Sequence, residues 1–71
     1  MPDMHYVDSS NIEAIGYDED SRELHVRFLK SGDTYVYHEI EAGVFEEMMQ
    51  ADSKGSYLNR RIKGTYQYSK L

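Results

Sequence analysis

The sequence predicts an α+β fold, a small three-stranded antiparallel meander covered by two short C-terminal helices. Three observations lead to this prediction. Apolar and polar residues alternate through 24–28 (LHVRF), which is the period of a half-buried strand. A second strand-favouring run at 34–38 (TYVYH) follows a glycine-containing turn. After Ile40 the apolar residues recur at helical spacing instead.

The meander begins with a strand over about residues 11–18 (NIEAIGYD), and an acidic turn leads from it into the second strand. Ser31 and Gly32 are the expected hairpin turn between the second and third strands, because glycine accepts a positive φ. A two-residue loop at this point places Phe28 opposite Tyr35.

Tyr35 and Tyr37 lie two residues apart on the third strand and therefore point to the same face. Sheet-type RNA-binding domains display stacking rings in this way. The predicted register puts both tyrosines on the apolar face of the second strand, with Val26 opposite Tyr37. Because a chain of this length needs that area for its core, we favour core packing of the two rings over a contact surface.

Two helices are expected after the third strand. The apolar side of the first helix contains Val44, Phe45, Met48 and Met49. Ser53 is the expected N-cap of the second helix, and Gly64 is its expected end. Residues 65–70 form either a further short strand or an ordered tail.

Length and composition limit the class of protein. Seventy-one residues make one domain, here 1–71, and we expect about its first six residues to be flexible. The sequence has no cysteine, no secretory signal pattern and no apolar run long enough to span a membrane. We therefore expect a cytoplasmic protein without a membrane partner.

Charge is distributed unevenly along the chain. The formal net charge is −5, which by itself argues against nucleic acid as a partner. However, residues 1–53 contain thirteen acidic and three basic residues, and residues 54–71 contain five basic residues and no acidic one. The first part therefore carries −10 and the second +5, so the domain can present a basic surface despite its acidic total.

The basic segment alternates cationic residues with tyrosines (SKGSYLNRRIKGTYQYSK). Cationic side chains bind phosphates, and tyrosine rings stack on unpaired bases. The candidate nucleic-acid-binding residues are Lys54, Tyr57, Arg60, Arg61, Lys63 and Tyr66. The alternative is that this segment only balances the acidic body within one molecule.

The sequence lacks catalytic and metal-binding patterns. It has no cysteine nucleophile, no G-x-S-x-G turn and no glycine-rich phosphate loop. In the predicted hairpin His25 lies directly opposite His38, but no spacing typical of metal ligands accompanies the pair. We expect no enzyme activity, no metal and no cofactor.

Several short motifs follow one another in a recognisable order. They are SSNI at 9–12, IGYD at 15–18, LxVxF at 24–28, Gly32, YVY at 35–37, Val44-Phe45 and SKGSYLN at 53–59, continuing to Ile62 and Tyr66. This pattern resembles the KTSC domain, which occurs at the C-terminus of some lysyl-tRNA synthetases and as a free-standing small bacterial or phage protein. The family often has a proline where this chain has 41–43 (EAG), and a phenylalanine where it has Leu58.

The resemblance implies a small binding module, with RNA binding inferred from the fusion to a synthetase. The expected partner is therefore RNA. The alternative is a protein partner, or self-association, in which acidic residues meet a basic surface. The acidic candidates are Asp18, Glu19, Asp20, Glu46 and Glu47.

Overall fold

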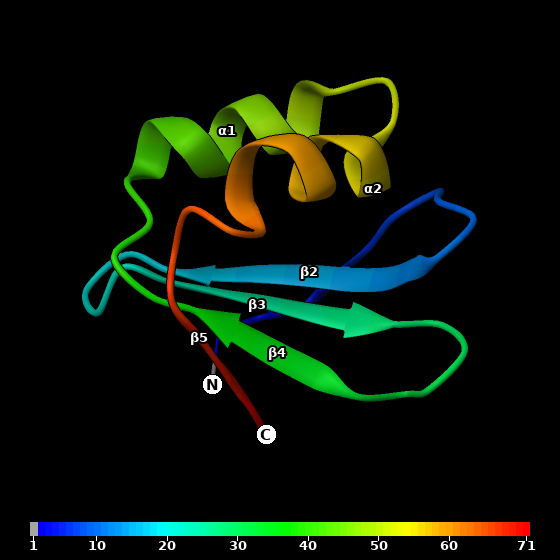
Figure 1. Cartoon of the computed structure of the whole chain (residues 1–71), viewed down its shortest axis with the longest axis horizontal. Coiled ribbons are helices and arrows are strands. Elements are labelled where there is room, and N and C mark those ends of the chain that lie inside the picture. Colours follow the sequence, from blue (N-terminus) through cyan, green and yellow to red (C-terminus); the bar gives the residue numbers. More distant parts are fainter. Residues whose placement is uncertain (1) are drawn as a thin grey trace.

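A computed structural model describes residues 2–71 as one five-stranded antiparallel sheet with a helical layer over one face (Figure 1). The strands are β1 (His5–Tyr6), β2 (Ile12–Asp18), β3 (Glu23–Phe28), β4 (Thr34–Tyr37) and β5 (Tyr68–Lys70). The helices are α1 (Ala42–Gln50) and α2 (Lys54–Tyr57), and α2 continues into a π-helical turn, η1 (Leu58–Ile62). Within residues 2–71, none of the helices has the length and apolar character that crossing a membrane requires.

The α+β class, the antiparallel sheet and the two short helices agree with the sequence prediction, but the number of strands was wrong. The strand order is β1-β2-β3-β4-β5, so the chain adds a strand at each edge of the predicted meander. β1 has two residues and β5 has three, and all five are exposed. Neither strand buries one face, so neither has the apolar alternation that identifies a strand in a sequence.

The hairpin between β3 and β4 has a longer loop than predicted. Phe28 N–H donates to the Asp33 carbonyl at 3.0 Å, and Gly32 has a φ of 71°. Tyr35 therefore lies opposite Val26 rather than Phe28, and the predicted register was wrong by two residues. A shift of two residues leaves every side chain on its own face, so the predicted apolar face is nonetheless the core face.

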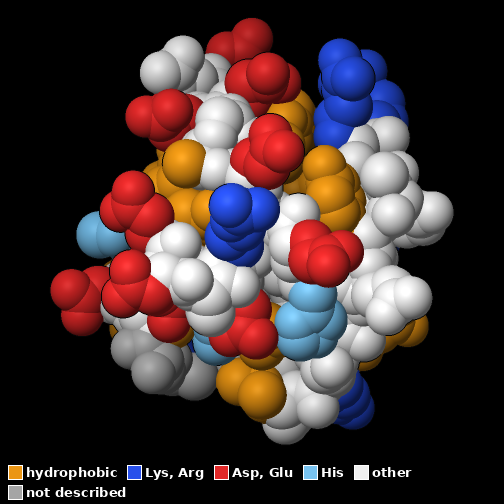
Figure 2. Space-filling model, turned by 90° about the vertical axis from the view of Figure 1, so that its left-hand side faces the viewer, with side chains coloured by type: hydrophobic (Ala, Val, Ile, Leu, Met, Phe, Trp, Pro, Cys, Tyr) orange, Lys and Arg blue, Asp and Glu red, His pale blue; other side chains and the backbone are white. Residues whose placement is uncertain are grey.

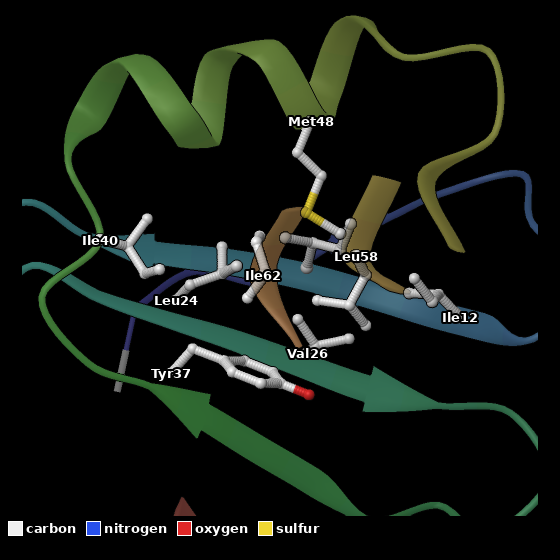
Figure 3. Close-up of a cluster of buried hydrophobic side chains, with 9 residues drawn as sticks. Ile12, Leu24, Val26, Tyr37, Ile40, Met48, Leu58 and Ile62 are labelled. Carbon is white, nitrogen blue, oxygen red and sulfur yellow. The ribbon is translucent and has the colours of Figure 1, made fainter. Parts of the chain in front are cut away.

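The core lies between the sheet and the helical layer (Figure 3). Its fully buried members are Ile12, Ile15, Leu24, Val26, Tyr37, Ile40, Met48, Leu58 and Ile62. Tyr37 is 1% exposed, which confirms the predicted core packing for this ring, whereas Tyr35 is only half-buried. The predicted apolar side of α1 also packs here, with Met48 at its centre.

The second helix begins where the sequence predicts. The Ser53 hydroxyl accepts a hydrogen bond from Ser56 N–H at 3.3 Å, which satisfies one unpaired donor of the first turn. In η1 the Lys63 N–H donates to the Leu58 carbonyl at 2.8 Å, five residues back. Gly64, with a φ of 84°, follows this turn and directs the chain toward β5.

Candidate nucleic-acid interface

A groove of about 370 Å³ lies between α1 and the chain around η1. It brings together four of the six predicted site residues, Tyr57, Arg60, Arg61 and Tyr66. Val44 and Glu47 of α1 and Thr65 complete its lining. Residues separated by up to nine positions thus share one surface because the chain reverses direction after Gly64.

The two arginines are the basic part of this groove. Leu58 and Ile62 turn inward from η1 and are buried, so Arg60 and Arg61 between them face solvent. Within residues 2–71 neither arginine forms an ion pair with a carboxylate. Single π-helical turns of this kind occur frequently at functional sites. The structure therefore presents two adjacent guanidinium groups that are free to bind an anion.

The two tyrosines of the groove are half-buried and packed against the core. The Tyr57 hydroxyl donates to Glu47 Oε1 at 3.0 Å. Burial, and then this hydrogen bond, raise the pKa of Tyr57 above its ordinary value of 10.0. Tyr57 is thus held against α1 as a neutral phenol, and the Glu47 carboxylate places a negative charge on the α1 side of the groove.

The two predicted lysines lie outside the groove. Lys54 Nζ donates to the Ala51 carbonyl at 3.3 Å and so fastens the connection between α1 and α2. Lys63 Nζ lies 5.4 Å from the centroid of the Phe28 ring, on the other side of the 60–66 segment. The structure therefore does not gather all six predicted residues on one surface.

Lys63 belongs to a second and larger cavity, of about 500 Å³. Its aromatic lining residues are Phe28, Tyr35, Tyr37 and Tyr68. Register explains the grouping, since Tyr68 lies opposite Tyr37 and both therefore point to the helix side of the sheet. The centroid of the Tyr68 ring lies 5.5 Å from the Tyr35 ring centroid and 5.8 Å from the Tyr37 ring centroid.

Sequence reasoning missed Tyr68 as a site residue. The signal was the alternation of Tyr66 and Tyr68 around Gln67, which is compatible with a strand, but the sequence left residues 65–70 open between strand and tail. Only the pairing with β4 places Tyr68 beside Tyr35 and Tyr37.

The histidines are arranged differently from the prediction. His25 lies opposite Val36, because of the same two-residue shift in register, and His38 follows the end of β4. Glu23 lies between the histidines, 3.9 Å from His25 Nε2 and 3.4 Å from His38 Nδ1. Within residues 2–71, no group of three or more histidine, cysteine or acidic side chains is placed to hold a metal.

Acidic side chains are numerous at the end of the molecule that contains the β2–β3 turn. Figure 2 shows the end of the molecule that contains the β2–β3 turn, where acidic side chains are spread over the surface. A group of Lys and Arg side chains lies at one upper corner, and single basic side chains lie in the middle of the acidic surface and at its lower edge. Asp18 ends β2, and Glu19 and Asp20 follow it in this turn. The three acidic residues line a shallow depression together with His5 and Tyr17. Glu46 and Glu47 are exposed on α1 instead, so the acidic residues named from the sequence occupy two places.

Comparison with known proteins identifies the family. The model of the KTSC domain matches residues 8–66. A crystal structure of a KTSC domain protein from Yersinia pestis superposes with a TM-score of 0.94 at 35% sequence identity, over 100% of this chain and 99% of that one. Similar chains also include a protein of Tsukamurella paurometabola, 42% identical over 60 residues that cover 84% of this chain and 88% of the relative.

A third relative is much longer. The lysine–tRNA ligase of Nostoc sp. is 36% identical over 64 residues, which are 90% of this chain but 11% of the ligase. The chain thus corresponds to a small segment of that enzyme. The family match, the sequence identities and the superposition agree with one another, and the chain belongs to the KTSC domain family.

Proposed function

We propose that this KTSC domain is a non-enzymatic binding module that contacts RNA through the groove beside η1. The observation that carries the proposal is the adjacent, exposed pair Arg60 and Arg61, which bind no carboxylate among residues 2–71 of a chain with net charge −5. Free guanidinium groups on an acidic protein favour an anionic partner. The similarity to segments of lysine–tRNA ligases supports RNA as that partner.

The η1 side and the α1 side of the groove contribute differently to RNA binding. Arg60 and Arg61 bind backbone phosphates, which sets affinity without reading sequence. Tyr66 supplies an apolar surface at the groove floor. Glu47 repels phosphate on the α1 side, so the strand is confined to the side of the arginines.

The test is a titration of fluorescent single-stranded RNA and of an RNA hairpin, followed by anisotropy. If three phosphates of a single strand are contacted, raising salt from about 50 mM to about 200 mM weakens binding on the order of 20-fold. Arg60→Ala and Arg61→Ala each lower the affinity and reduce the salt slope by about 0.7. Both residues are exposed, so neither variant changes the fold.

Arg22→Asn is the charge-matched control. Arg22 is exposed at the acidic end and has a φ of 57°, which asparagine tolerates. This variant loses the same unit of charge and keeps wild-type affinity. The proposal fails if RNA binding is absent at the lower salt concentration, or if Arg22→Asn weakens it as much as Arg61→Ala does.

A protein partner is the second candidate, and the separation of charge between the acidic end and η1 favours it (Figure 2). In its simplest form the acidic end of one copy meets Arg60 and Arg61 of another. Sedimentation at rising protein concentration tests this version. Association that weakens with salt supports self-association, whereas a constant monomer mass removes it.

A further inference from the structure

The aromatic cavity beside Lys63 is a separate feature from the arginine groove. Phe28 on β3, Tyr35 and Tyr37 on β4 and Tyr68 on β5 all point to the helix side of the sheet. The helical layer does not close over the outer part of this face, since Tyr68 is 60% exposed and Tyr35 is half-buried. Tyr37 is 1% exposed and belongs to the core, so the hollow is closed at Tyr37 and open to solvent at Tyr68.

The cavity has the dimensions and lining of a small-ligand site. Its volume of about 500 Å³ is within the range of roughly 300–1,000 Å³ that is typical of such sites. Tyr35 connects two of the other rings, since its ring centroid lies 5.5 Å from that of Phe28 and 5.5 Å from that of Tyr68. The Tyr35 and Phe28 rings are perpendicular, so the walls of the cavity meet at an angle. Because Lys63 Nζ lies over the Phe28 ring and Tyr68 is 60% exposed, Tyr68 and the half-buried Tyr35 are the rings that a flat ligand can reach.

The charge of the lining indicates the sign of the ligand. Lys63 is the one charged side chain among the described residues that line the cavity, and none of them is acidic. This is notable in a chain with thirteen acidic residues. The nearby pair of Lys70 Nζ and Asp33 Oδ2, 3.2 Å apart, is neutral as a unit. An aromatic hollow with a single cation at its edge fits a planar ring that carries an anionic group.

We propose that this cavity holds one unpaired nucleotide, with the base against Tyr35 and Tyr68 and the phosphate at Lys63. The proposal rests on the proposed function, because Lys63 and Gly64 line the cavity while Arg60 and Arg61 line the groove. The same short segment thus separates the two surfaces. A strand whose base occupies the cavity continues over this segment and brings its next phosphates to the arginines.

The cavity is tested first without RNA, by NMR titration of the domain with adenosine 5′-monophosphate. The expected result is saturable shifts of Lys63, Gly64 and Tyr68 at concentrations up to about 10 mM. Tyr68→Ala weakens this binding roughly five- to tenfold, because it removes one stacking face. Tyr6→Ala is the matched control, since Tyr6 is 76% exposed on the opposite edge of the sheet and keeps wild-type affinity.

Lys63→Ala separates the contribution of the phosphate from that of the base. The variant binds adenosine 5′-monophosphate no better than it binds adenosine, whereas its affinity for adenosine is unchanged. Ribose 5-phosphate, which lacks the base, causes no shift of Tyr68. The inference is overturned if adenosine 5′-monophosphate leaves the three cavity residues unshifted, or if its affinity is the same in Tyr68→Ala.

An octameric single-stranded RNA then distinguishes this inference from the proposed function. Both hold if Arg60→Ala/Arg61→Ala weakens the octamer but not the mononucleotide, and Tyr68→Ala weakens both. If adenosine 5′-monophosphate binds but the octamer binds no more tightly than the mononucleotide, the nucleotide site is supported and the RNA proposal is overturned. If octamer binding depends on the arginines and Tyr68→Ala affects neither ligand, the RNA proposal is supported and the nucleotide site is overturned.

Discussion

At the scale of single residues, His25 is the one polar side chain among the described residues that is buried. It is 6% exposed on the sheet face away from the helices, and its Nδ1 has no hydrogen-bond partner in the described structure. Burial lowers the pKa of His25 below its ordinary value of 6.5, and the carboxylate of Glu23, 3.9 Å from Nε2, acts in the opposite direction. The balance favours a neutral imidazole in the folded protein.

This shift predicts how stability depends on pH. Unfolded chains take up a proton at His25 near pH 6.5, while the folded protein resists protonation to a lower pH. The free energy of unfolding therefore decreases as pH falls below about 6.5. Denaturant unfolding between about pH 7.5 and about pH 5.5 measures the decrease, and His25→Gln makes it smaller.

His5→Gln is the control for that measurement, because His5 is exposed and its loss leaves the buried imidazole in place. An equal pH dependence in wild type and His25→Gln would contradict the assignment of the effect to His25.

At the scale of elements, two glycines in the helices have different surroundings. A Cβ added at Gly43, in the first turn of α1, meets no atom within 4 Å. A Cβ added at Gly55, in α2, would lie 2.5 Å from Asn11 Oδ1. Gly55 thus permits the close approach of α2 to the residues before β2, and this contact joins two of the motifs by which the sequence resembles its family, SSNI and SKGSYLN.

Alanine substitutions at these two positions have opposite predicted effects on stability. Gly43→Ala stabilises the protein by roughly 0.5–1 kcal/mol, because alanine loses less backbone entropy in a helix. Gly55→Ala destabilises it by about 1–3 kcal/mol, since the new methyl group overpacks the contact with Asn11. Urea denaturation of both variants checks the pair, and a stabilising Gly55→Ala would contradict the packing described.

The elements also determine how much of this structure the sequence could predict. β3 alternates apolar and polar residues in the sequence, and its apolar face was predicted correctly as the face toward the helices. The register of β3 with β4 was predicted wrongly, because register depends on loop geometry. Ser31 and Gly32 alone do not specify a loop length. β5 has three exposed residues and so lacks the burial pattern that identifies a strand, and its contribution to the cavity becomes visible only in three dimensions.

At the scale of the whole molecule, the uneven charge of the sequence becomes a division of surfaces. The β2–β3 turn lies at an acidic end of the molecule (Figures 1 and 2). The groove with Arg60 and Arg61 lies beside η1. The sequence predicted that acidic and basic residues are separated, and the basic segment 54–71 was expected to form one site. The fold instead divides that segment between a groove, an aromatic cavity and the connection held by Lys54.

RNA binding to the surface formed by residues 57–68 can be examined by amide NMR mapping with a single-stranded RNA. The largest shifts are expected within 57–68 and on the cavity strands β3 and β4, and they shrink as salt is added. Residues 18–23, at the acidic end, stay unshifted. RNA does not bind this surface if no amide shifts, or if the shifts centre on residues 18–23.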